Sequence, residues 1–384
     1  MGLLRSYLYI KKFKFPTNTV TIAGDVADFP HCVHINTTSW GTAGERTNFF
    51  GAWNVNGKRI QFFDKNGVNL PYEVEYYDSA STEAVYWVKK TVLTGDTGIS
   101  NYIYIAYGND ADGTDYHGVY ETYGAQQQAV WNSNFVGVWH MGDNSYVAGD
   151  SSSEVKDSTV NGNHGNDVGS TDITGKVRKG RDFVTDDYIE ATDINVTALT
   201  VSAWMKFDTK TATRVAISKD SVSGGGGREW VINMYTDGTI LGYVFQTGSI
   251  FNSVQVAGNV CDSVFRHIVM TNNIGDGGDG KTRIYVNAGA ANVSSGAITG
   301  INNTTSLVTF GKNPSSGTPQ YLDGALDEIR ISNTARNADF IKLEYQSMLK
   351  TNWNGDGWYS WEAQTTPARI PRMGFSNHNN PGVV

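Results

Sequence analysis

Cysteine and charge are both scarce in this chain. Only two cysteines, Cys32 and Cys261, occur among 384 residues, and charged residues make up 18%. Two distant cysteines exclude a disulfide framework, and no zinc-type ligand spacing is present, so we expect both thiols to be free and buried. Proline is also rare, with 8 residues against 43 glycines, a balance typical of strands joined by turns.

Positive charge and long apolar runs are missing as well. The net charge is −8, and we interpret the small cluster of Lys11, Lys12 and Lys14 as the solvated face of a first strand. Nucleic-acid binding usually needs a broad positive surface, so we expect none. No apolar run is long enough to span a bilayer, and residues 1–15 lack the pattern of a secretory signal peptide, so we predict neither feature.

Alternation of apolar and polar residues is the clearest signal that is present. In residues 199–207 every second side chain, from Leu199 to Phe207, is apolar. This period of two predicts a strand with one buried face. Hydrophobic residues make up 39% of the chain, enough for a sizeable core, and such runs recur, which predicts a sandwich of antiparallel strands. The other runs are residues 84–93, 101–107, 229–235, 265–271, 283–287 and 325–331.

One segment has helical periodicity instead. In residues 337–348 the apolar side chains step by three and four from Ala338 to Met348. Asn337 is a plausible N-cap, and Asp339 lies in the first turn, where the helix dipole favours a carboxylate. We predict one short helix here, packed on the sandwich, followed by a last strand near residues 357–362.

The end of the chain shows no periodicity. Residues 365–384 contain three prolines and several asparagines. This composition predicts an extended polar tail, which is either disordered or an arm that orders against a neighbouring subunit.

Several blocks resemble laminin G-like, concanavalin A-like jelly rolls, in the same order along the chain. Residues 157–165 (DSTVNGNHG) resemble the first turn of that family, and 180–190 (GRDFVTDDYIE) its D-D-Y-I loop. Residues 324–336 (GALDEIRISNTAR) resemble its D-E-V-R-I strand. Val160 and Phe265 depart from the Gly and Trp usual in the family. The further matching blocks are 134–142, 199–204 and 265–287.

The N-terminal part resembles a second family. Residues 60–64, 71–78, 85–89 and 102–109 resemble a β-rich domain of unknown function that often precedes such jelly rolls in bacterial, archaeal and viral surface proteins. Together the resemblances imply an all-β fold with two domains and one short helix. The implied parts are an N-terminal β-sandwich over 1–130, a laminin G/concanavalin A-like jelly-roll sandwich over 131–364 and the polar tail over 365–384.

The first resemblance also implies a structural calcium site. Such proteins often hold a metal where the first turn, the D-D-Y-I loop and the D-E-V-R-I strand meet, which corresponds to Asp157, Asp187 and Asp327. Calcium prefers about six to eight oxygen ligands. Two alternatives stay open: Asp157 and Asp187 stabilise turns by hydrogen bonds, and Asp327, expected on the same face as Ile329, joins an ion pair.

Aromatic residues of the C-terminal part are candidates for carbohydrate binding. Trp230, Tyr235, Tyr243 and Phe245 could line the concave sheet of a jelly roll beside polar side chains. The alternative is that half of them belong to the core, and alternation favours this for Trp230.

Signals for catalysis or nucleotide binding are weak. Residues 275–282 (GDGGDGKT) match the letters of a P-loop, but a strand pattern follows them instead of a helix, so we interpret them as a hairpin tip. A glycosidase of this fold would carry its pair of carboxylates inside the jelly roll. The closest acidic pair, Glu73 and Glu75, lies outside it. We therefore expect no enzyme.

These observations predict a non-enzymatic protein for adhesion or assembly, located on a virion or an extracellular surface. The first hypothesis is a phage virion component, such as a tail, fibre or head-decoration protein. Its expected partners are other subunits of that assembly, and further copies of this chain bound through the polar C-terminal segment 365–384. The alternatives are a calcium-dependent glycan-binding module of a bacterial or archaeal surface protein, and a carbohydrate-active enzyme.

Overall fold

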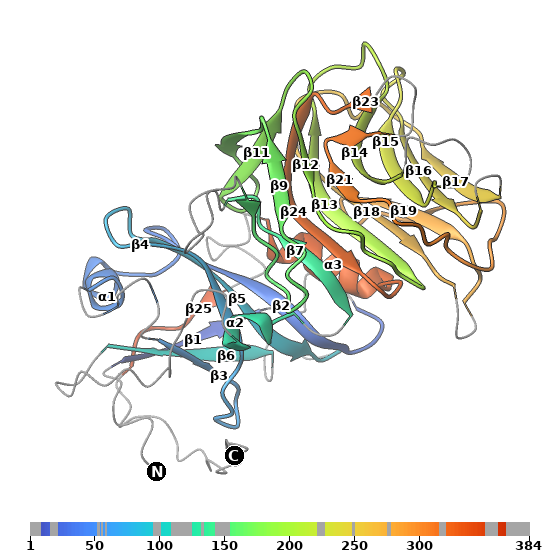
Figure 1. The fold of residues 1–384 in the computed structure, drawn as a ribbon. Coiled ribbons are helices and arrows are strands. Elements are labelled where there is room, and N and C mark those ends of the chain that lie inside the picture. The colour runs from blue at the N-terminus through green and yellow to red at the C-terminus, as the bar shows by residue number, and fades with distance from the viewer. Residues whose placement is uncertain are drawn as a thin grey trace, which may run out of the picture. The chain divides into compact units, whose positions relative to one another are not determined.

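The computed structural model divides the chain into two compact units, which we describe separately. The first unit comprises Met1–Val130 and Gln346–Val384, and the second comprises Trp131–Tyr345. Antiparallel strands are the main regular elements in the described part of both units (Figure 1). The structure describes residues 9–15, 22–51, 54, 57, 60–94, 101–108, 125–131, 134–142, 154–220, 227–247, 250–274, 278–314, 320–349 and 360–365.

The first unit contains two small sheets with strand orders β25-β1-β6-β3 and β2-β5-β4. Its centre is aromatic: the ring of the fully buried Trp40 lies 4.6 Å from that of Phe49 and 5.4 Å from that of Tyr107. The elements are β1 Tyr9–Lys14, β2 Val26–Ile35, α1 Ala43–Phe49, β3 Gln61–Phe63, β4 Tyr72–Asp78, β5 Glu83–Val92, β6 Tyr102–Tyr107, α2 Ala125–Gln128 and β25 Ser360–Trp361. The strands predicted at 84–93 and 101–107 are thus confirmed.

The last strand belongs to the first unit, contrary to the prediction that the jelly roll extends to residue 364. β25 pairs with β1, with Trp361 opposite Phe13, and the two rings lie 4.5 Å apart. A strand two residues long carries no local information about its partner, so the aromatic contacts decide its sheet. The predicted tail lies outside the described residues from 366 onward.

One of the three lysines of β1 does not lie on a solvated face. Lys11 is buried and pairs with Glu45, and burial lowers the pKa of its ammonium. Lys12 and Lys14 both pair with Glu362. The sequence-based interpretation is therefore wrong for Lys11, because β25 and the segment before α1 cover this strand.

The second unit is a sandwich of two eight-stranded sheets. Sheet I has the order β10-β11-β24-β13-β18-β19-β20, with β7 also paired to β24, and sheet II has the order β17-β16-β15-β14-β21-β12-β9-β8. The strands are β7 Phe135–Trp139, β8 Glu154–Val155, β9 Gly165–Val168, β10 Thr171–Thr174, β11 Lys179–Phe183, β12 Tyr188–Glu190, β13 Leu199–Phe207, β14 Arg214–Lys219, β15 Trp230–Met234, β16 Ile240–Phe245, β17 Phe251–Val256, β18 Arg266–Asn272, β19 Thr282–Val286, β20 Asn292–Val293, β21 Val308–Phe310, β22 Lys312–Asn313, β23 Gln320–Tyr321 and β24 Gly324–Ser332.

The core of the second unit lies between the sheets. Val201 and Met205 of sheet I belong to one buried cluster with Trp230 and Ile232 of sheet II. The alternation predicted for residues 199–207 is confirmed, since β13 sends every second side chain into this cluster. Burial of apolar surface between two sheets stabilises such a sandwich.

The predicted helix is also confirmed. α3 spans Ala338–Ser347, and the Asn337 side chain caps it by accepting a hydrogen bond from the backbone N–H of Phe340 at 2.9 Å. Ile341 packs on Val269 and Tyr285, which places the helix on the outer face of sheet I (Figure 1). None of the described helices is long and apolar enough to cross a membrane. Both cysteines are free, as predicted, although one of them is only half-buried.

Candidate functional site

Strand β15 decides which of the predicted aromatic side chains a ligand can reach. Trp230 is fully buried and packs in the core beside Ile232. Val231 and Asn233 alternate with them and point outward from sheet II. Trp230 therefore cannot stack on a ligand. The structure supports the alternative that this residue belongs to the core.

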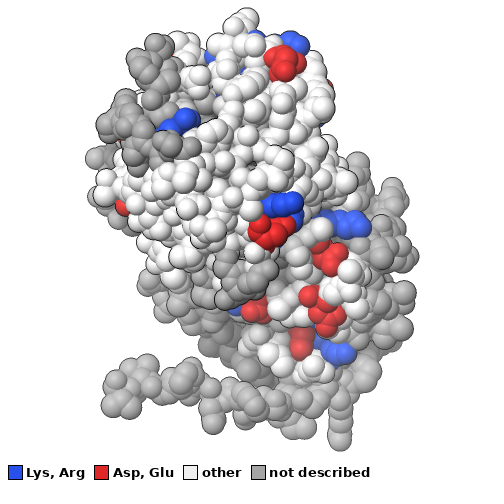
Figure 2. Space-filling view, turned by 90° about the vertical axis from the view of Figure 1, so that its right-hand side faces the viewer, with Lys and Arg blue, Asp and Glu red and all other residues white. Residues whose placement is uncertain are grey.

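Tyr235 and Tyr243 lie together in a pocket on the outer face of sheet II. The pocket has a volume of about 450 Å³. This is within the size range of small-molecule sites. We call it the aromatic pocket; its described lining consists of Thr213, Arg228, Val231, Asn233, Tyr235, Tyr243, Phe245, Phe251, Asn313 and Gln320. The side of the second unit that carries β17 faces the viewer in Figure 2 and shows few charged side chains.

Four rings form one side of the aromatic pocket. The ring centres of Tyr243 and Phe245 lie 6.2 Å apart with their planes 21° from parallel. Phe251 lies 5.1 Å from Phe245 and is 47% exposed, and Tyr235 is 36% exposed. Exposed rings in a concave site offer the apolar contact area that small ligands use.

The two tyrosines are joined by their hydroxyl groups. The phenolic oxygens of Tyr235 and Tyr243 are 2.5 Å apart. Burial and then this hydrogen bond raise the pKa of Tyr243 well above its ordinary value. The Tyr243 phenol therefore stays protonated at neutral pH and keeps a hydroxyl that can donate or accept a hydrogen bond.

Asn233 is the most unusual polar residue of the aromatic pocket. It is only 6% exposed, and its side-chain Oδ1 is buried without a hydrogen-bond partner. A buried polar atom without a partner costs about 1 to 3 kcal/mol. Buried polar atoms are normally hydrogen-bonded, so an ordered water or a ligand is expected to supply the missing partner. Sequence analysis missed Asn233, although it lies on the same outward face as Val231, one residue after the buried Ile232.

The predicted calcium ligands are not brought together. Among the described residues, the carboxylate oxygens of Asp157, Asp187 and Asp327 do not form a group within 4.8 Å of one another. Asp157 accepts hydrogen bonds from the backbone N–H groups of Val138 and Asn163 at 2.9 and 2.8 Å, and burial raises its pKa. These contacts fit the alternative of a turn-stabilising carboxylate. Calcium binding stays a prediction.

The half-buried Asp187 also serves a turn. Its Oδ2 accepts a hydrogen bond from the backbone N–H of Val184 at 2.9 Å, three residues earlier in the same loop. This short-range contact again matches the alternative interpretation of the D-D-Y-I loop.

Asp327 lies on the opposite face of β24 from the one predicted. A β-bulge at Glu328, whose φ is +52°, shifts the register between β24 and β13. Leu326, Ile329 and Ile331 therefore face the core, and Asp327 faces outward. The expected shared face with Ile329 is wrong, because a bulge inserts one residue and reverses the alternation. No local sequence pattern marked this bulge.

Asp327 is nevertheless fully buried. Its Oδ2 accepts hydrogen bonds from the backbone N–H groups of Lys176 and Val177 at 2.6 and 3.0 Å, while its Oδ1 has no partner. Burial, followed by the nearby Glu328, raises the pKa of Asp327 to about 8. The group is protonated over much of the neutral range, so no ion pair is needed.

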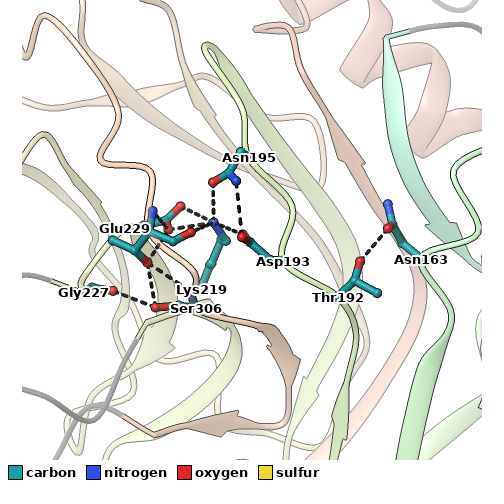
Figure 3. A network of polar contacts seen from close by, with 9 residues as sticks. Asn163, Thr192, Asp193, Asn195, Lys219, Gly227, Glu229 and Ser306 are labelled. Carbon is teal, nitrogen blue, oxygen red and sulfur yellow. Dashed lines mark hydrogen bonds and ion pairs between the residues drawn. The ribbon is translucent and has the colours of Figure 1, made fainter.

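A buried lysine fills a cage of oxygen atoms where β14 ends beside the start of β15 (Figure 3). Lys219 Nζ lies 2.6 Å from Glu229 Oε1, 2.8 Å from Asp193 Oδ1 and 2.9 Å from Asn195 Oδ1. The backbone oxygen of Thr304 adds a fourth contact at 3.3 Å. Both Lys219 and Glu229 have fully buried side chains. The chain thus supplies its own cation to a set of ligands of the kind that calcium prefers.

The remaining candidates have structural roles. The described part of the P-loop-like segment, from residue 278, leads into β19, and Arg283 pairs with Asp279 there, so the hairpin interpretation is confirmed. Glu75 accepts a hydrogen bond from Trp87 Nε1 at 2.7 Å. A bulge between Val74 and Tyr76 removes Glu75 from the face of Glu73.

Comparison with solved structures gives distant similarities. The binding domain of Paraclostridial Mosquitocidal Protein 1 is 14% identical with a TM-score of 0.43, and the match covers 56% of this chain and 52% of that one. The binding domain of Botulinum Neurotoxin DC in complex with SialylT is 13% identical with a TM-score of 0.42, covering 57% and 53%. The chain spans about half the length of these proteins. No curated protein sequence matches the chain.

Two family models match the chain. One, described as the Concanavalin A-like lectin/glucanases superfamily, matches residues 183–342, from the end of β11 into α3. The other, Domain of unknown function (DUF2341), matches residues 56–141, from the segment before β3 through β7. The predicted blocks at 199–204, 265–287 and 324–336 lie inside the first match. Residues 183–342 thus match the concanavalin A-like lectin/glucanases superfamily, and a match to the domain of unknown function DUF2341 precedes them.

Proposed function

We propose that the second unit is a non-enzymatic carbohydrate-binding module for adhesion, and that the sugar binds in the aromatic pocket. The observation that carries this proposal is the buried amide of Asn233, whose Oδ1 has no partner although it lines a pocket with four aromatic rings. The superfamily match to residues 183–342 agrees with a lectin-like role.

The chemistry of the lining fits a sugar. A side-chain amide carries an acceptor and two donors, so Asn233 can bind two neighbouring hydroxyl groups of one ring. The tyrosine hydroxyls offer further polar contacts, and the exposed face of Phe251 can cover the apolar face of a sugar ring. These three features lie on adjacent strands, β15, β16 and β17.

A binding function is favoured over hydrolysis by the charges of the pocket. Glycosidases usually need two carboxyl groups on opposite sides of the bond they cleave. None of the described residues that line the aromatic pocket is Asp or Glu. The superfamily name includes glucanases, but the pocket residues support a lectin-like role.

The proposal is tested by screening the full chain on a glycan array and then measuring the affinity of the best glycans by calorimetry. We expect Tyr243→Ala to weaken binding by at least about tenfold, since it removes a ring and a hydroxyl. Tyr188→Ala is the matched control, because Tyr188 is half-buried on β12 of the same sheet and does not line the pocket. Absence of any glycan binding, or equal losses in both variants, would contradict the proposal.

We further propose that the module works in a surface or particle assembly, with a phage virion component as the first hypothesis. The support is the resemblance of the N-terminal part to a domain found in front of jelly rolls in surface proteins, together with its family match. The genes on either side of this one provide the test. Capsid and tail genes are expected for a virion component, whereas polysaccharide-utilisation genes would contradict it.

A further inference from the structure

We propose that the aromatic pocket is specific for acidic saccharides, whose carboxylate or sulfate group binds the guanidinium group of Arg228. This inference rests on the proposed carbohydrate binding and names the class of sugar. It follows from the one charged residue in the described lining and from the way that residue is held.

The one charge in the described lining of the aromatic pocket is positive, and the buried Asp220 outside that lining offsets part of it. Arg228 is the single charged side chain among its ten described lining residues. The other polar groups are hydroxyls and amides, and the Tyr243 phenol is held in its neutral form because burial raises its pKa. No negative charge of the described lining therefore opposes an anion next to Arg228.

Arg228 is held from two sides. Its guanidinium carbon lies 4.4 Å from the ring centre of Phe245, so the group packs against an aromatic ring. Its Nε donates a hydrogen bond to Asp220 at 3.3 Å, and the carboxylate of Asp220 is fully buried behind it. An arginine fixed by stacking and by Nε loses little further conformational entropy when it binds a ligand.

The free end of Arg228 is its two terminal nitrogens. Neither Nη1 nor Nη2 forms a hydrogen bond with any residue that the structure describes, and the side chain is 38% exposed. These two nitrogens form the planar fork that binds a carboxylate or a sulfate through two parallel hydrogen bonds.

The three parts of the pocket can act on different parts of one ligand. The amide of Asn233 meets ring hydroxyls, the rings of Tyr243 and Phe251 cover the sugar, and Arg228 meets the acidic group. Arg228 and Tyr243 both approach the ring of Phe245, which places the cation beside the aromatic wall. A neutral sugar would keep the contacts with Asn233 and with the aromatic rings but would lack the ionic contact with Arg228.

The test compares acidic ligands with related neutral ones. The probes are lactose, its sulfate ester and sialyllactose, together with oligogalacturonate and the methyl ester of oligogalacturonate, each measured by calorimetry at low salt. We expect the acidic member of each pair to bind about 10 to 100 times more tightly, since hydrogen bonds to charged groups are the strong ones. Preference for the sulfate ester or for the carboxylates identifies which anion the fork accepts. The preference should decline as salt is raised.

Variants assign the preference to one residue. Arg228→Gln should remove the advantage of the acidic ligands and leave the affinity for the neutral ligands within about twofold, whereas Arg228→Lys should keep part of it as a point charge. Arg214→Gln is the matched control, because Arg214 lies on β14 of the same sheet, pairs with Asp323 and does not line the pocket. Thermal unfolding verifies that each variant is folded.

The outcomes separate this inference from the proposed function. Equal binding of acidic and neutral ligands, or a preference that survives in Arg228→Gln, overturns the role of Arg228 and leaves carbohydrate binding standing. Failure of every saccharide to bind overturns both proposals.

Discussion

Tyr235 and Tyr243 share a hydrogen bond between phenolic oxygens 2.5 Å apart, where β15 ends and β16 returns beside it. The bond fixes both rings at the mouth of the aromatic pocket. Tyr235→Phe keeps the ring and removes the hydroxyl, so we expect glycan affinity to fall about two- to tenfold, the range of one neutral hydrogen bond. Calorimetry measures this change, with Tyr188→Phe as the control. Unchanged affinity would mean that the hydroxyl pair does not contact the sugar.

Asn233→Leu should change binding and stability in opposite directions. The substitution removes a buried oxygen that has no partner, so we expect the free energy of unfolding to stay equal or to rise by about 1 kcal/mol. Glycan affinity should fall below detection, because the amide is lost. Urea unfolding and calorimetry on the same samples measure both effects. A clear loss of stability would indicate that the amide serves the fold.

Lys219→Met should destabilise the second unit strongly. The substitution leaves the buried carboxylate of Glu229 without its cation, and breaking a buried ion pair in this way costs about 3 to 5 kcal/mol. The double variant with Glu229→Leu as well should recover much of that loss, since neither charge remains. Urea unfolding of the two variants is the measurement. Equal losses in the single and double variants would contradict the role of the pair.

Asp327 should make stability depend on pH near neutrality. Its pKa of about 8 in the folded state lies above that of an unfolded Asp, near 4, so the folded state binds the extra proton between these values. Its contribution to stability therefore falls as pH rises from about 4 to 8, by up to about 1.4 kcal/mol per pH unit. Asp327→Asn keeps the acceptor oxygen and should flatten this dependence. Melting temperatures from pH 5 to 9, compared with the unaltered protein, test it.

The calcium prediction is tested by metal removal. Asp157 and Asp187 are already bonded to backbone N–H groups, and the three predicted ligands do not converge, so we expect EDTA followed by added calcium to leave the melting temperature unchanged. A metal bound only to the folded protein would raise that temperature further as its free concentration exceeds its dissociation constant. A calcium-dependent shift of several degrees, abolished by Asp157→Asn, would support the predicted site.

Local periodicity was sufficient to predict several of the longer strands and the helix α3. β13 and α3 were placed within a residue or two, because alternation and three- or four-residue steps follow directly from the geometry of one strand or one helix. Two predictions, the face of β24 on which Asp327 lies and the sheet to which the last strand belongs, were wrong for one common reason. The bulge at Glu328 and the pairing of Trp361 with Phe13 are set by partners far away in the chain.

The aromatic pocket shows the same limit at the level of function. Tyr235 and Tyr243 were predicted because aromatic residues are visible in any sequence, whereas Asn233 and Arg228 resemble ordinary loop or surface residues until their surroundings are known. Only burial distinguishes the partnerless amide, and only the contacts with Asp220 show how the guanidinium is held.

The sequence by itself therefore determined the all-β class, the positions of several strands along the chain, the short helix and the match of residues 183–342 to the concanavalin A-like superfamily. Those features depend on residue periods and on motifs read along a single stretch of chain. Tertiary structure alone decided which side chains meet in the aromatic pocket and which carboxylates stay buried. These side-chain contacts depend on the order of the strands within a sheet and on the register between segments distant in the chain. No local sequence pattern encodes that order or that register.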